Sequence, residues 1–202
     1  MRVLYVLGSL YVALCGALLW RGHETQSAPV AVRPAPRPHR APAPAPAPPA
    51  GPVEWFHRIK PYCNAVEVET QLRAQPAPAG AEGTGYAAAC LALAGKIDLA
   101  RQQILSLPAS ERTTAVGIVF EIGHPVADAG DDKSAGPIME LVVEFWPNHY
   151  MALYHAGASE FILGQSDLSR KHLLSFLQYY HENDGWRSNA LQMLQKLGVS
   201  AQ

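Results

Sequence analysis

The feature that most constrains the fold is a repeat in the C-terminal part of the chain. Three glycines, Gly95, Gly130 and Gly164, stand 35 and 34 residues apart, each between two runs of residues that favour helix. A small residue lies seven positions before each glycine, and apolar residues lie nine and twelve positions after it. A pattern that recurs at this period indicates a repeated supersecondary unit rather than a single irregular core.

These columns of residues have a physical meaning. A glycine between two helical runs permits the tight left-handed turn that ends a helix. The small residues let two helices approach closely, and the two apolar positions are three residues apart, so that they share one helix face. Each pair of helices leaves this face exposed until the next pair covers it. Because no alternating apolar–polar run is long enough for a sheet, the predicted fold class is all-α.

A helix–turn–helix period of this length, with small, glycine, alanine and apolar columns, resembles the tetratricopeptide repeat. The resemblance covers about residues 82–182 in three copies, and Pro147 matches the proline at the end of the family's second helix. It implies a solenoid of stacked antiparallel hairpins near residues 82–108, 112–146 and 149–182, with the first helices lining a concave groove. Pro125 is expected to interrupt the first helix of the middle copy.

The flanking segments fit an array with closed ends, so that the folded domain is predicted to span residues 53–202. Asn64 can cap a helix over residues 65–75, after a short amphipathic helix at 54–60. Asp184 can cap a final helix over residues 186–197, followed by Gly198.

The first 21 residues are predicted to be a signal-anchor or a signal peptide. Residues 3–20 carry no charge and lie between Arg2 and Arg21, and their length is close to that of a membrane-spanning helix. Large residues at 18–20 do not favour cleavage there. We therefore expect a single-pass protein of the cell membrane with an exported C-terminal domain, with cleavage and secretion as the alternative.

Residues 22–52 are predicted to form a disordered Pro/Ala-rich stalk. Ten of the 17 prolines lie between Pro29 and Pro52. Proline removes backbone donors and fixes φ, so this segment is expected to stay extended.

Composition and cysteine content narrow the function further. The 16 basic and 17 acidic residues nearly balance, which argues against a nucleic-acid surface. Cys63 and Cys90 can form a disulfide in an oxidising compartment. The alternative is that both are small buried apolar residues.

One segment has the residue types of a metal site. His124, Asp128, Asp131 and Asp132 lie within nine residues and could gather a hard cation such as calcium. Their order does not match an EF-hand loop. The alternative interpretation is that the aspartates cap a helix starting near Ser134, and on this basis neither a metal nor another cofactor is expected.

The candidate groove residues are mostly aromatic side chains of the first helices: Phe120, His124, Tyr150, Tyr154 and Phe161. Aromatic anchors contribute strongly to binding surfaces. Aromatic residues at helical spacing can equally belong to the core. No nucleophile paired with a base and no phosphate-binding loop can be identified, so we do not expect an enzyme.

The sequence therefore favours a membrane-tethered, exported interaction or scaffold module that binds a protein or peptide on its concave face. Residues 3–20 provide the membrane contact. The alternative function is that of a metal-binding exported protein using the loop at 124–132. Self-association into a homo-oligomer is a third hypothesis.

Overall fold

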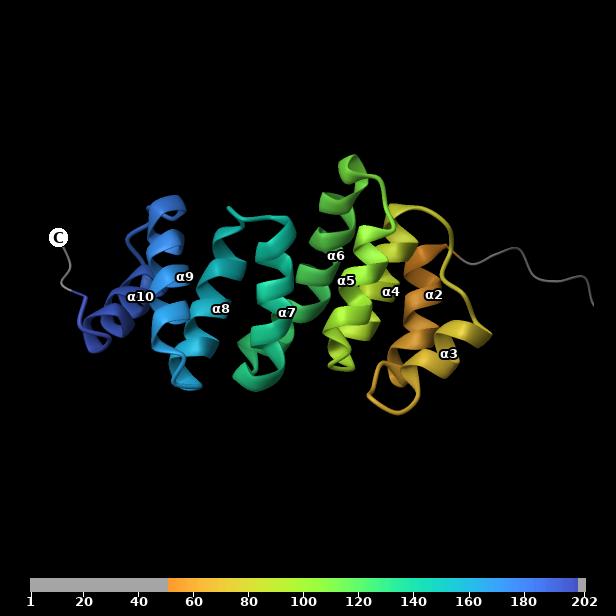
Figure 1. Cartoon of the computed structure of the whole chain (residues 1–202), viewed down its shortest axis with the longest axis horizontal. Helices are drawn as coiled ribbons and strands as arrows, with labels where there is room; N and C mark the ends of the chain where they lie inside the picture. The colour runs from red at the N-terminus through yellow and green to blue at the C-terminus, as the bar shows by residue number, and fades with distance from the viewer. Residues whose placement is uncertain (1–50, 200–202) are drawn as a thin grey trace, which may run out of the picture. The chain divides into compact units, whose positions relative to one another are not determined.

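The computed structural model describes residues 51–199, and this part of the chain contains helices and no strand. The predicted all-α class is therefore confirmed for these residues. The helices, with the labels of Figure 1, are α2 (Pro52–Ile59), the 3₁₀ turn η1 (Lys60–Tyr62), α3 (Val68–Ala74), α4 (Ala81–Leu93), α5 (Ile97–Leu105), α6 (Ala109–Asp128), α7 (Asp132–Phe145), α8 (Tyr150–Ile162), α9 (Ser166–Tyr179) and α10 (Gly185–Lys196).

The predicted N-terminal segment 1–21 and all but the end of the Pro/Ala-rich segment 22–52 lie outside the described residues. Within residues 51–199, no helix combines the length and the apolar character that crossing a bilayer requires.

The three repeated glycines stand where helices reverse direction. Gly95, Gly130 and Gly164 have φ angles of 72°, 77° and 75°, and each separates two consecutive helices. In each turn the N–H after the glycine donates to the carbonyl five residues earlier, as Lys96 does to Leu91 at 2.9 Å. This left-handed closure satisfies carbonyls at the helix end, and few residues other than glycine adopt it readily. The predicted role of these glycines in the turns is confirmed.

The expected break at Pro125 is wrong. Helix α6 continues through Pro125 and ends at Asp128. Pro125 lies in the last turn of the helix on an exposed position, so its missing N–H removes a single hydrogen bond near an end that frays in any case. As a result His124 and Asp128 lie one turn apart on the same helix.

Capping side chains lie at the start of several helices or in the turns before them. Asp131 accepts from the N–H of Ser134 at 3.2 Å, and Asp184 accepts from that of Arg187 at 3.2 Å, so α7 and α10 start at these caps. Asn64 accepts from two N–H groups of the loop before α3, which starts at Val68 and is shorter than expected.

Each helix from α4 to α10 packs on neighbours close in sequence, and Figure 1 shows them following one another along the described residues. The contacts between consecutive helix pairs differ. The α4–α5 pair meets the α6–α7 pair mainly through α4 and α6, whereas the α6–α7 pair meets the α8–α9 pair mainly through α7 and α8, and α8 meets α6 only over a short region. One hydrophobic cluster extends from α2 to α8, and a second joins α8, α9 and α10 around Leu173 and Phe176.

A disulfide holds the N-terminal helices on the rest. Cys63, just after η1, is bonded to Cys90 in α4, with Cα atoms 4.8 Å apart. The indole of Trp55 in α2 donates to the carbonyl of Gln75 at 3.1 Å and so links α2 to the end of α3. The two cysteines therefore form the disulfide that was the first of their two interpretations.

The closeness of α4 and α6 predicts opposite effects for two glycine substitutions. A methyl group on Gly85 would lie 2.9 Å from the backbone Cα of Ala115, whereas on Gly117 its nearest neighbour is a Trp146 ring atom at 4.0 Å. We expect Gly85→Ala to lower the free energy of unfolding by about 1–3 kcal/mol through overpacking. Gly117→Ala should raise it by about 0.5–1 kcal/mol through helix propensity. Urea unfolding followed by circular dichroism measures both, and equal effects would contradict the assigned helix contact.

Candidate functional site

Two regions of the described residues gather polar and aromatic side chains. The first is a continuous chain of ring contacts, here called the aromatic–histidine cluster, across α6, α8, α9, α10 and their loops. Neighbouring ring centroids in it are 4.1–6.2 Å apart. Its members are Phe120, His124, Trp146, His149, Tyr150, Tyr154, His155, Phe176, Tyr180 and Trp186.

The cluster brings together four of the five predicted groove residues, namely Phe120, His124, Tyr150 and Tyr154. Phe161 stands apart, with the ammonium of Lys196 at 5.9 Å from its ring. Tyr154 is only 6% exposed and packs between Phe176 and Trp186. Phe120 is similarly buried. These two rings therefore belong to the core, and the groove interpretation has to be corrected for them; Tyr150 is 43% exposed.

At one edge of the cluster, two imidazoles face each other across the short α6–α8 contact. The Nε2 atoms of His124 and His155 are 3.0 Å apart, and Asp128 Oδ1 lies 3.6 Å from the first and 3.9 Å from the second. Burial, together with the nearby His124, lowers the pKa of His155 to about 4, although Asp128 opposes the shift. The ring of His155 is therefore neutral at physiological pH.

The predicted four-residue metal group is not assembled as expected. Asp131 caps α7, and Asp132 lies in the first turn of that helix, where its carbonyl accepts a hydrogen bond from the Ser159 hydroxyl. Burial raises the pKa of Asp132 above its usual value. Capping therefore accounts for Asp131. His124 and Asp128 are instead joined by His155, which sequence spacing alone could not place beside them because it follows 31 residues after His124.

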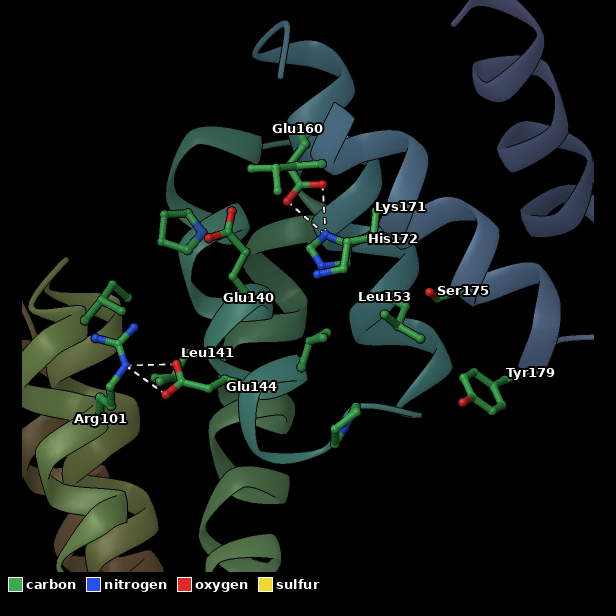
Figure 2. Close-up of a pocket in the computed structure, with 15 residues that line it drawn as sticks. Arg101, Glu140, Leu141, Glu144, Leu153, Glu160, Lys171, His172, Ser175 and Tyr179 are labelled. Carbon is green, nitrogen blue, oxygen red and sulfur yellow. Dashed lines mark hydrogen bonds and ion pairs between the residues drawn. The ribbon is translucent and has the colours of Figure 1, made fainter. Parts of the chain in front are cut away.

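The second region is a pocket of about 620 Å³ against α5, α7, α8 and α9. Figure 2 shows side chains from these helices turned toward it, with Arg101 and Glu144 on one side and Glu160 and His172 on the other. The Arg101 guanidinium donates to Glu144 at 2.8 Å and 3.1 Å. Sequence reasoning did not identify this pocket, because its residues come from three different repeats.

The buried, hydrogen-bonded pair of Glu160 and His172 forms part of one wall of the pocket. His172 Nδ1 lies 2.9 Å from both carboxylate oxygens of Glu160, which is fully buried. Glu140 lies on the same wall; burial and the negative charge of Glu160 raise its pKa above the usual value, while His172 opposes the shift. Most of the charge in the pocket is thus engaged within the protein and holds α7, α8 and α9 in position.

The buried pair generates a stability prediction. Glu160→Ala leaves the buried His172 without its acceptor, and we expect the free energy of unfolding to fall by about 3–5 kcal/mol. Lys171 precedes His172 and is exposed, so Lys171→Ala should change the free energy of unfolding by less than about 0.5 kcal/mol. Thermal and urea unfolding of both variants provides the measurement. A Glu160→Ala variant as stable as Lys171→Ala would show that the pair contributes nothing.

The chain was also compared with known proteins. No protein-family model, no curated protein and no solved structure matches it. The function therefore has to be argued from the geometry of these two regions.

Proposed function

We propose that the folded part of this protein is a tetratricopeptide-like interaction or scaffold module, without catalytic activity of its own, exported and tethered to the membrane by residues 1–21. The Pro/Ala-rich segment 22–52 would act as its stalk. Its partner would be a protein or peptide.

The observation that carries the proposal is the row of three helix pairs, α4–α5, α6–α7 and α8–α9. Each pair turns at a positive-φ glycine, and each packs on the next. Elements that pack in a row, rather than around a single centre, leave long side surfaces, which is how repeat proteins bind extended partners. The family assignment itself rests on these turns and on the columns of small residues.

The aromatic–histidine cluster supports a choice of surface. Tyr150 and Trp186 are 43% and 36% exposed. Trp186 packs on the buried rings of Tyr154 and His155. Tyr150 packs on the half-buried ring of Tyr180. A partly exposed aromatic side chain backed by rigid packing loses little conformational freedom on binding, which favours its use as an anchor. We place the partner at this edge of the first helices, close to the groove implied by the family resemblance.

The disulfide supports export. Structural disulfides persist in oxidising compartments and are rare in the cytosol. The Cys63–Cys90 bond therefore fits a domain that folds outside the cytoplasm.

Photo-crosslinking in cells tests the binding surface. A benzoylphenylalanine at Tyr150 is expected to give a covalent adduct of discrete mass with one partner. The same probe at Leu105, which is 46% exposed on α5, is the matched control and should not give it. Tyr150→Ala should also reduce co-purification of that partner at least about tenfold if the ring is an anchor.

The outcomes of this test are distinct. An adduct whose partner is a second copy of the chain would replace the protein-partner hypothesis by self-association. Equal adducts from Tyr150 and Leu105, or none from Tyr150, would contradict the proposed surface.

Thiol labelling tests export separately. In a Cys15→Ser variant, Cys63 and Cys90 are the remaining cysteines. We expect a maleimide reagent added to denatured, unreduced cells to label neither of them, and to label both after reduction. Labelling without reduction would place the domain in a reducing compartment.

A further inference from the structure

Three potential ligand atoms converge where α6 meets α8. The Nε2 atoms of His124 and His155 and one carboxylate oxygen of Asp128 all lie within 4.8 Å of one another. They come from two helices that otherwise touch only over a short region.

We propose that His124, Asp128 and His155 form a three-ligand site for a divalent transition metal ion, with zinc as the ion that this donor set suits best. Because the Asp128 side chain is 50% exposed, a water molecule could supply the fourth ligand. The site goes beyond the proposed binding function and does not depend on it.

The spacing of the three atoms fits a tetrahedral ion. Zinc–nitrogen and zinc–oxygen bonds of about 2.0–2.1 Å place neighbouring ligand atoms about 3.3 Å apart. The observed separations of 3.0, 3.6 and 3.9 Å lie on both sides of this value. The Asp128 side chain is 50% exposed, so its carboxylate has room to rotate toward the two nitrogens when an ion binds.

The local structure supplies two ligands at once. His124 and Asp128 are separated by four positions on α6, so both side chains project from the same face of the helix. The Phe120 ring stacks on His124 at 4.8 Å, and the Trp186 ring lies 5.5 Å from His155. These aromatic contacts restrict the orientation of both imidazoles, which reduces the entropy that binding would cost.

The donor types select the class of ion. Two imidazole nitrogens and one carboxylate oxygen suit zinc and its neighbours in the first transition series, whereas calcium requires six to eight oxygen ligands. A neutral imidazole is the form that binds metal, and the Nε2 atoms of the two imidazoles lie 3.6 Å and 3.9 Å from Asp128 Oδ1. The proposed site keeps His124 and Asp128 from the loop at 124–132 and has His155 in place of Asp131 and Asp132.

Metal titration of the full-length chain tests the proposal. The protein is purified in a mild detergent without a histidine tag, treated with a chelator, and titrated by calorimetry with zinc and then with calcium. We expect one zinc per chain and no heat from calcium. Zinc at a hundredfold excess over its dissociation constant should raise the melting temperature by roughly 5–10 °C, because the ion joins α6 to α8.

Variants connect the binding to these side chains. Asp128→Asn keeps the shape of an exposed side chain but removes its charge, and His124→Asn removes one imidazole; each should weaken zinc binding at least about tenfold. Asp98→Asn and His181→Asn are the matched controls at other exposed positions and should bind zinc as the unmodified chain does. Circular dichroism verifies that each variant is folded.

Cobalt gives a readout that is independent of stability. Co²⁺ bound in place of zinc should show the visible absorption of a tetrahedral ion, and this absorption should disappear in Asp128→Asn. The proposal is overturned if zinc does not bind, if calcium binds instead, or if Asp128→Asn and His124→Asn retain the affinity of the controls.

Discussion

The structure between α4 and α9 depends on apolar packing between helices that are near neighbours in the sequence, and one continuous hydrophobic cluster extends from α2 to α8. Close approach makes this packing possible. Gly85 lets α4 meet the backbone of α6, and Gly136 lets α7 meet Ser159 of α8. The buried apolar residues accordingly form two clusters that follow the order of the helices, one from α2 to α8 and one from α8 to α10.

The packing changes between the first and second steps of the row. Helix α6 packs on α4, whereas α8 packs on α7 and reaches α6 only at its edge. At this edge apolar coverage gives way to imidazole, carboxylate and aromatic groups, and here the aromatic–histidine cluster and the three candidate metal ligands meet. The two hydrophobic clusters divide at α8, and Glu160 and His172 form a polar link between α8 and α9. The contact between α6 and α8 therefore gathers more imidazole, carboxylate and aromatic groups than the purely apolar contacts of the described residues.

How far the sequence predicted these features depends on the range of the interactions involved. The glycine turns and the caps Asp131 and Asp184 are local, and the sequence indicated all of them. The candidate metal ligands could not be grouped from the sequence for two reasons. Pro125 was expected to end a helix, which hid the one-turn relation between His124 and Asp128, and the third ligand His155 comes from a different repeat. Burial of Tyr154 was equally out of reach, since it depends on how α9 and α10 cover α8.

The disulfide has a mechanical consequence for a domain held at its N-terminal end. A pulling force entering at residue 51 passes through α2 to Cys63 and then crosses the sulfur bridge directly to Cys90. The chain between these two cysteines, including α3 and most of α4, lies inside the covalent loop and carries no load. Tension would therefore be delivered to the last turn of α4, and the loop would keep its structure while the segment before it was stretched.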